Sequence, residues 1–431
     1  EDKQIEDYTF SDDEAQLLLT AGSEAIYRHS TKEWTYVYDN TTRKVAGLNE
    51  KGKQMHATFS PDGKKVGFVM DNNMYYKDLA SGKITQVTTD GKWNHIINGS
   101  CDWVYEEEFS FTKAFAWSPD NRYIAYYRFD ESAVKEFTMT NYTGELYPEN
   151  VTFKYPKVGM ENSKVSIHIF DTKTKKKVDV DRTSDPDGYI PRIKWTNDPS
   201  KLCVFWMNRH QNHLELLIAN SVSGKTTKLL QEENKYYIDI HDNLTFLQDG
   251  QGFIWTSEQD GFNHIYLYDM SGSLKKQITT GNWEVTSFYG VDEKNKAIYY
   301  QSASASPMER EIFSVGLDGV TKKQLHVDKG MNTAQFSTTF DLFVLNHSTI
   351  NSAPTYTVYD RKGKVVRVLE NNEGVKAQQD EAGAQPVEFF NFTTSEGVDL
   401  NGYMIKPANF DATKKYPVFM FQYSGPGSQQ V

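Results

Sequence analysis

The sequence predicts a mainly β protein built as a β-propeller, and three observations lead to this fold class. A short unit, an aromatic residue followed by a polar turn, recurs seven times and becomes looser along the chain. Successive units lie 43 to 78 residues apart, and short strands with Asp/Gly turns repeating every ~40–50 residues are typical of propeller blades. The segments between the turns, such as 65–70 and 123–127, are rich in β-branched and aromatic residues and lack the spacing of helical repeats. The seven units begin at Phe10, Phe59, Trp117, Trp195, Phe246, Tyr289 and Phe336.

Composition limits the class of protein. With 431 residues and 38% hydrophobic residues the chain can bury a large core, and no apolar run approaches the ~18 residues of a membrane helix. The net charge of −11 argues against nucleic acid and mildly favours cationic partners. Cys101 and Cys203 are expected to be buried thiols, with a single bridge between them left open. Because the chain starts at Glu1, we expect a trimmed N-terminus, and the lack of a signal peptide has no meaning.

Residues 1–370 are assigned to the propeller, which we expect to begin inside its first unit. A second mark, an aromatic-Asp pair before a turn, follows in several units, at Tyr38-Asp39, Phe170-Asp171, Tyr268-Asp269 and Tyr359-Asp360. Two of the steps between units, of 58 and 78 residues, are too long for a plain blade. We therefore predict insertions at about 94–115 and at 129–157, and insertions on a repeat scaffold usually carry binding or assembly functions.

The first insertion contains Asp102-Trp103-Val104-Tyr105-Glu106-Glu107-Glu108-Phe109. An acidic triplet is most often a solvated loop. Here, however, Trp and Tyr precede the charges and favour burial, so we expect the acidic cluster at the rim of a cavity, where it could bind a cation such as a peptide's α-ammonium. On a strand, Glu107 and Glu108 would point to opposite faces, so we predict a turn or short helix there.

The repeat pattern stops near residue 370 and a different pattern follows. Residues 371–385 are polar and predict a linker with room for one helical turn, and 386–431 is expected to be the start of a second, truncated domain. Within it, 387–393 and 400–406 predict a hairpin, and Tyr416–Tyr423 predicts a buried strand of a mixed or parallel sheet. A tight Gly-Pro-Gly turn at 425–427 is expected after this strand.

At these motifs the chain resembles the dipeptidyl peptidase IV family, in the prolyl oligopeptidase group of serine hydrolases. The resemblance covers nearly the whole chain, and its most specific parts are the acidic motif at 102–108 and the Tyr-Ser-Gly-Pro motif at 423–426. Arg28-His29-Ser30 and Tyr155-Pro156-Lys157 also carry it. The resemblance implies an eight-bladed propeller that caps an α/β-hydrolase domain, with the active site between them.

The resemblance also implies roles for individual residues. Glu107 and Glu108 would bind the substrate's free amino terminus, Arg28 would bind the carbonyl of the second substrate residue, and Tyr423 would donate to the oxyanion. The 129–157 insertion would be an arm for homodimer formation. From the residues alone, Arg28 could instead be an exposed strand end and Tyr423 a core residue. No cofactor or metal is expected, because His210 and His213 lack a third acidic ligand and are expected to be loop residues.

The activity that we expect is a serine exopeptidase that releases N-terminal dipeptides of the Xaa-Pro or Xaa-Ala type. The sequence holds no Gly-x-Ser-x-Gly elbow, so the catalytic Ser, Asp and His are expected beyond these residues. An exported, periplasmic or cell-surface location is expected. The alternatives are a prolyl tripeptidyl peptidase or related endopeptidase, and a non-catalytic propeller that binds peptides or proteins.

Overall fold

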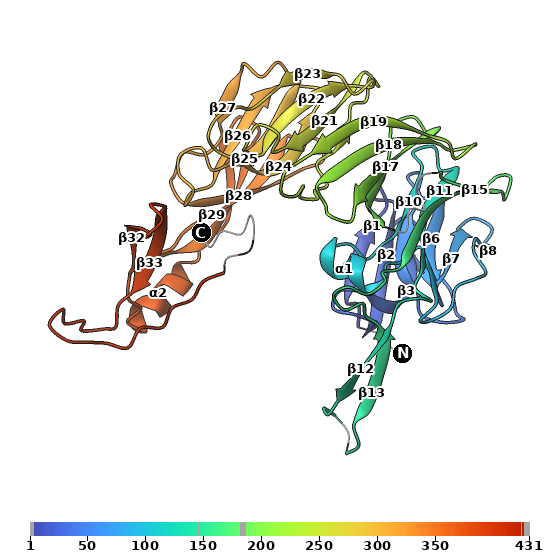
Figure 1. Ribbon diagram of the computed structural model, residues 1–431, viewed down its shortest axis with the longest axis horizontal. Coiled ribbons are helices and arrows are strands. Elements are labelled where there is room, and N and C mark those ends of the chain that lie inside the picture. Colours follow the sequence, from blue (N-terminus) through green and yellow to red (C-terminus); the bar gives the residue numbers. More distant parts are fainter. Residues whose placement is uncertain (1–3, 145, 182–186, 424, 426–431) are drawn as a thin grey trace. The chain divides into compact units, whose positions relative to one another are not determined.

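Antiparallel sheet dominates the structure, a computed structural model that describes residues 4–144, 146–181, 187–423 and 425 (Figure 1). The chain divides into two compact units, Glu1–Asp242 and Asn243–Val431. Among the described residues, seven successive sheets of four or five strands follow one another along the chain, and in each the neighbouring strands pair largely in sequence order. This arrangement fits the blades of a propeller.

The first unit holds four of these sheets in the described residues. The first two are β1 (Asp7–Phe10), β2 (Gln16–Ala25), β3 (Thr31–Asp39) and β4 (Lys44–Gly47), then β5 (Met55–Phe59), β6 (Lys65–Met70), β7 (Asn73–Asp78) and β8 (Ile84–Gln86). The third is β10 (Phe115–Trp117), β11 (Tyr123–Asp130), β14 (Lys164–Asp171) and β15 (Lys177–Asp179), with β9 (Ile96–Asn98) paired to β11. The fourth is β16 (Gly188–Trp195), β17 (Lys201–Asn208), β18 (His213–Asn220) and β19 (Thr226–Glu233).

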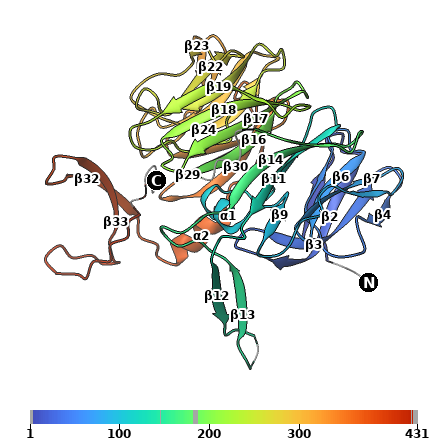
Figure 2. The same cartoon turned by 45° about the vertical axis from the view of Figure 1, so that its right-hand side comes forward.

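The two predicted insertions both lie in the third sheet. The first carries helix α1 (Trp103–Glu108) between β9 and β10, so the acidic triplet lies off the sheet strands, as predicted. The second carries a hairpin, β12 (Glu136–Asn141) paired with β13 (Glu149–Lys154), which is drawn as a separate two-stranded ribbon below α1 (Figures 1 and 2). This insertion begins slightly later than predicted, because β11 continues to Asp130.

In the part of the second unit that the structure describes there are three more sheets and a separate hairpin. The sheets are β20 (Thr245–Phe246), β21 (Gly252–Ser257), β22 (His264–Asp269) and β23 (Leu274–Gln277), then β24 (Val285–Asp292), β25 (Ala297–Ser302), β26 (Glu311–Gly316) and β27 (Lys322–Gln324), and finally β28 (Met331–Phe336), β29 (Leu342–Thr349), β30 (Ser352–Asp360) and β31 (Val365–Glu370). Helix α2 (Glu373–Glu381) follows, and then β32 (Val387–Thr393) pairs with β33 (Asp399–Ile405).

The repeated turn unit marks the end of the first strand of a sheet. In six of the seven sheets formed by the described residues the aromatic residue is the last residue of that strand, whereas Tyr289 lies inside β24. The serine that follows explains the turn: the Ser60 hydroxyl donates to the Asp62 carboxylate over 2.7 Å and accepts the Lys65 amide over 3.0 Å. Ser11 and Ser118 make equivalent contacts. The aspartate of the second mark ends the third strand, and its carboxylate accepts backbone amides of the following turn, as at Asp171.

Within each unit, apolar side chains fill the spaces between sheets that follow one another in sequence. Val69 and Met74 of the second sheet pack in one cluster with Phe115 and Ile124 of the third. A second cluster joins the third and fourth sheets through side chains such as Ile167. Because these sheets of the first unit bury faces against their neighbours in sequence, their stability is shared between adjacent sheets, as in other repeat folds.

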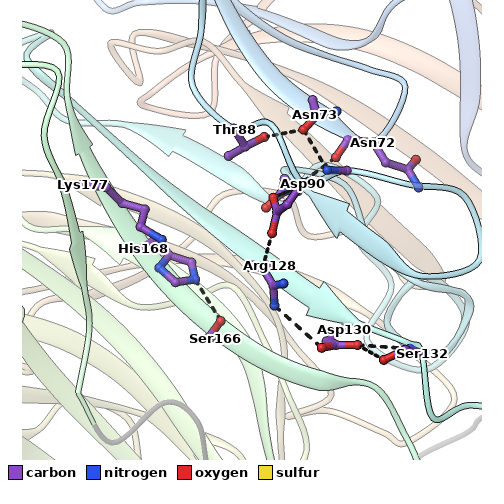
Figure 3. A network of polar contacts seen from close by, with 12 residues as sticks. Asn72, Asn73, Thr88, Asp90, Arg128, Asp130, Ser132, Ser166, His168 and Lys177 are labelled. Carbon is purple, nitrogen blue, oxygen red and sulfur yellow. Dashed lines mark hydrogen bonds and ion pairs between the residues drawn. The ribbon is translucent and has the colours of Figure 1, made fainter.

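A polar network also ties the second sheet to the third (Figure 3). The Asp90 carboxylate accepts a hydrogen bond from Arg128 of β11 over 2.8 Å and another from Asn98 of β9 over 2.9 Å. Asn73 of β7 holds the turn at residue 91 by accepting its backbone amide over 2.9 Å. The loop after β8 is therefore fixed against the sheet whose insertion carries α1.

Several sequence expectations meet the structure away from the site. Cys101 and Cys203 are buried and are not bonded to each other. Within the described ranges, no helix has both the length and the apolar character that a membrane span needs. The linker contains a helix of nine residues, α2, and not the single turn expected.

The strand predicted at Tyr416–Tyr423 is wrong for this structure. The segment has no regular secondary structure, and Phe419 and Tyr423 are 92% and 65% exposed. A buried strand needs neighbours that accept its backbone hydrogen bonds and cover its faces. Among the described residues no strand pairs with this segment, so its apolar side chains stay exposed. The turn expected at 425–427 lies mostly outside the described residues.

Candidate functional site

Helix α1 begins at a buried aspartate. The Asp102 carboxylate caps the helix by accepting the Tyr105 amide over 3.0 Å, and it also accepts the hydroxyl proton of Ser163 over 2.5 Å. Asp102 is 4% exposed, and burial raises the pKa of its carboxyl group, although these two hydrogen bonds act in the opposite direction. The aspartate at the start of the acidic motif is therefore structural: it fixes where the short helix begins.

The aromatic residues of the motif hold α1 on the sheets. Tyr105 is 2% exposed, its hydroxyl accepts the backbone amide of Ile190 in β16 over 2.9 Å, and its ring packs at 5.0 Å from that of Phe129. Trp103 packs at 4.4 Å from Tyr155, at the root of the β12–β13 hairpin. The expectation that these rings are at least partly buried is confirmed, and they leave the following carboxylates on a helix with a fixed position.

The three glutamates differ in exposure because consecutive helical residues point ~100° apart. Glu106 is 2% exposed, Glu107 is partly buried, and Glu108 is exposed. The short helix predicted here is confirmed. On a strand, the neighbouring side chains of Glu107 and Glu108 would point to opposite faces, and the helix avoids this arrangement.

Arg28 and Glu107 are brought together from positions 79 residues apart. Arg28 lies in the loop between β2 and β3, and its Nη1 donates to Glu107 Oε1 over 2.7 Å. The Arg28 side chain is 70% exposed and that of Glu107 is 26% exposed. The pair therefore presents a cation and a carboxylate to solvent at one place on the first unit.

The backbone of the Arg28 loop is also bound by the buried Glu106 of α1. Glu106 Oε1 accepts the backbone amides of His29 over 2.6 Å and of Ser30 over 3.1 Å. Within the loop, the Ile26 amide donates to the Ser30 carbonyl over 2.9 Å. From the sequence, Glu106 is only one member of the acidic triplet and has no predicted role of its own. Its position between two aromatic residues, Tyr105 and Phe109, does indicate burial. A buried carboxylate needs a hydrogen-bond partner.

Tyr423 belongs to the second unit. It lies in the irregular exposed segment described above, so it is not a core residue in this structure.

A hydrogen-bonded series of serine, histidine and aspartate side chains lies in the third sheet, and it was not predicted from the sequence. His168 Nε2 lies 2.9 Å from the Ser166 hydroxyl, and its Nδ1 lies 2.7 Å from Asp179, and Figure 3 shows the serine contact. Burial lowers the pKa of His168. Ser166, however, lies inside β14 and pairs with Arg128 of β11, so it is not on the exposed turn that a nucleophilic serine needs. We interpret this series as part of the sheet.

Metal ligands do not gather in the described part of the chain: no three His, Cys, Asp or Glu side chains form a group that could hold an ion. His210 lies in a turn, as expected, whereas His213 opens strand β18 and contacts Glu233 at 3.1 Å, so its assignment to a loop was wrong.

Comparison with known proteins identifies similar chains over almost the whole length. Residues 11–354 match the family model described as the dipeptidyl peptidase IV N-terminal region. The chain is 30% identical to a probable dipeptidyl-aminopeptidase B of Phaeosphaeria nodorum, covering 98% of this chain and 50% of that protein. It is 29% identical to a probable dipeptidyl peptidase 4 of Arthroderma benhamiae, covering 99% of this chain and 57% of that protein.

Solved structures agree with these matches. The crystal structure of Porphyromonas gingivalis dipeptidyl peptidase 4 superimposes with a TM-score of 0.94 at 41% identity, covering 99% of this chain and 61% of that one. A putative dipeptidyl aminopeptidase IV from Bacteroides ovatus, at 24% identity and a TM-score of 0.77, shares the fold. The chain thus spans between one half and two thirds of the length of these proteins.

Proposed function

Because the chain belongs to the dipeptidyl peptidase IV family, we propose that it carries the amino-terminus-binding half of a serine exopeptidase that releases N-terminal dipeptides. The observation that carries the proposal is the contact between Arg28 and Glu107, which lies on a short helix that also carries Glu108. A dipeptide-releasing enzyme must measure two residues from a free amine, and this requires an anionic group at a fixed position.

In this proposal Glu107 and Glu108 share the substrate's ammonium group. Each charge-assisted hydrogen bond is worth roughly 1.5–3 kcal/mol, so blocked or longer amino termini are excluded. Arg28 lies 2.7 Å from Glu107 and is 70% exposed, so its guanidinium has donors left for the carbonyl of the second substrate residue. It also offsets the repulsion between neighbouring carboxylates when no substrate is bound.

The chemical step is proposed to take place on a serine outside these 431 residues. The sequence lacks a Gly-x-Ser-x-Gly elbow, and the chain spans only part of its relatives, which supports this proposal. Tyr423 would donate its hydroxyl to the oxyanion of the tetrahedral intermediate. We propose proline or alanine at the second substrate position.

The rest of the architecture follows from the same proposal. We propose an eight-bladed propeller, of which the described sheets are seven blades, and the β32–β33 hairpin and the segment to Tyr423 as the entry to an α/β-hydrolase domain. The β12–β13 hairpin, with Met139 and Val151 exposed, would be an arm of a homodimer interface. An exported, periplasmic or cell-surface protein is proposed as well.

The test is a release assay on the whole protein with a chromogenic Xaa-Pro substrate, free or N-acetylated at its amino terminus. Release from the free form only supports the proposal. Equal release from both forms indicates an endopeptidase, and release of tripeptides from longer peptides indicates a tripeptidyl peptidase. Peptide binding without release, measured by calorimetry, would assign the chain to a binding protein.

A further inference from the structure

The three glutamates of α1 divide into one buried and two accessible residues, and the buried one has a distinct set of contacts. Glu106 Oε1 accepts two consecutive backbone amides, those of His29 and Ser30, from the loop that carries Arg28. The residue is 2% exposed, and Ser30 is 3% exposed. These amides belong to a loop and, in the described residues, make no ladder hydrogen bonds, so the carboxylate oxygen is their acceptor.

The neighbouring residue contacts the side chain of the same loop. Glu107 binds the Arg28 guanidinium at 2.7 Å. Glu106 accepts the backbone amides of the next two residues, His29 and Ser30. Two adjacent helical residues thus hold one loop at two points. The helix itself is fixed on its other sides by the Asp102 contact with Ser163 and the Tyr105 contact with Ile190.

From this geometry we propose that Glu106 is a positioning residue: it does not touch substrate but sets the distance between Arg28 and the Glu107–Glu108 pair. The inference rests on the proposed function, because it concerns the same amine-binding site. A carboxylate that is 2% exposed and occupied by two amides cannot at the same time receive a peptide's ammonium on that oxygen. Without it, the loop loses both of its backbone amide contacts to α1, and Arg28 is free to move away from Glu107.

Two conservative variants separate positioning from direct binding of the amine. Glu106→Gln keeps an acceptor oxygen at full length but removes the charge. Its amide nitrogen would lie where Oε2 is now buried without a partner in the described residues. Glu106→Asp keeps the charge but is one methylene shorter, so it reaches the amides poorly. Positioning predicts that KM for the free-amine Xaa-Pro substrate stays within about threefold in Glu106→Gln and rises at least tenfold in Glu106→Asp, with kcat changing less than KM. Direct ionic binding predicts the opposite order, and that order would overturn the proposal.

A matched control accounts for general loss of stability. Asp171 is also buried in the first unit and accepts two backbone amides, of Lys173 and Thr174, but it lies at the end of β14 and contacts no residue of the Arg28 loop. Asp171→Ala is expected to lower the unfolding temperature without changing KM. If Asp171→Ala raises KM as much as Glu106→Asp does, the effect is one of stability and the proposal is wrong.

A second measurement does not depend on activity. Hydrogen exchange of the His29 and Ser30 amides, followed by mass spectrometry of peptides covering 26–31, should be at least tenfold faster in Glu106→Ala and Glu106→Asp than in the unmutated protein or in Asp171→Ala. Unchanged exchange in both Glu106 variants would overturn the positioning role, whatever the enzyme releases. If exchange changes as expected but the unmutated enzyme releases no dipeptides, the loop anchor stands and the proposed exopeptidase function fails.

Discussion

The replacement Glu107→Gln removes the negative charge that faces Arg28 while keeping the shape of the side chain. In the proposed complex it weakens one charge-assisted hydrogen bond to the substrate's ammonium, worth roughly 1.5–3 kcal/mol. At ~1.4 kcal/mol for each factor of ten, kcat/KM for a free-amine Xaa-Pro substrate should fall about 10- to 150-fold. The folding cost is smaller, since the partner Arg28 is 70% exposed and exposed ion pairs contribute ~0.2–1 kcal/mol.

The assay compares kcat/KM for Xaa-Pro chromogenic substrates between pH 6 and 9.5 in the whole protein. An α-amino group titrates near ~7.7–8.0, and it is the charged form that the carboxylates attract. The unmutated enzyme should therefore lose activity as the pH rises through this range, and the loss should be shallower in Glu107→Gln because less of its binding depends on the charge.

A suitable control is Glu136→Gln. Glu136 also pairs with a cation, Lys154 at 3.7 Å, in the same unit, but it lies on the β12–β13 hairpin. Its kcat/KM and pH profile should match those of the unmutated protein. If Glu107→Gln behaves like this control, or if it slows the N-acetylated and the free substrate by the same factor, the assignment of Glu107 to the amine is refuted.

Three further predictions concern other parts of the chain. Tyr423→Phe should lower kcat about 100-fold with little change in KM, since one oxyanion donor contributes ~3 kcal/mol to the transition state, and steady-state kinetics with an unchanged kcat would contradict its role. Burial raises the pKa of Glu131 to about 7, so the neutral form is favoured in the folded protein and stability is lost as pH rises from ~4.5 to above 7. Glu131→Gln should therefore stabilise by ~3 kcal/mol more at pH 8 than at pH 4.5 in urea unfolding, and an equal effect at both values would count against the shift. Met139→Lys, on the exposed β12–β13 hairpin, should convert the proposed dimer to a monomer in light scattering, and an unchanged mass would exclude this face of the hairpin as the interface.

The sheets could be predicted because the turns that end their first strands depend on hydrogen bonds between residues close in sequence. In the first three units the serine and the aspartate of the turn hydrogen-bond to each other and to the backbone within a few residues, so the pattern is visible in the sequence, as at Ser60 and Asp62. Tyr289 departs from it: β24 continues past this residue to Asp292, and its pairing is irregular between Phe288 and Gly290. The short helix at 103–108 was predictable from a geometric need, since two adjacent carboxylates cannot converge from a strand.

The rest of the site depends on contacts far apart in sequence. Nothing near Glu106 indicates that its oxygen binds amides at residues 29 and 30, because that pairing exists only once β2, β3 and α1 have packed. At Tyr416–Tyr423 the sequence pattern is that of a buried strand, but burial requires partners that the described residues do not provide.

The β12–β13 hairpin has an unequal distribution of constraints along its length. At its root, Tyr155 packs on Trp103 of α1 and Phe153 packs at 6.0 Å from Tyr27, the residue before Arg28. At its far end Tyr142 and Tyr147 are about four-fifths exposed. Natural variation should follow this gradient. Insertions, deletions and substitutions at the tip can accumulate among species. A substitution of Phe153 or Tyr155 would disturb the surroundings of the Arg28 guanidinium and should be selected against.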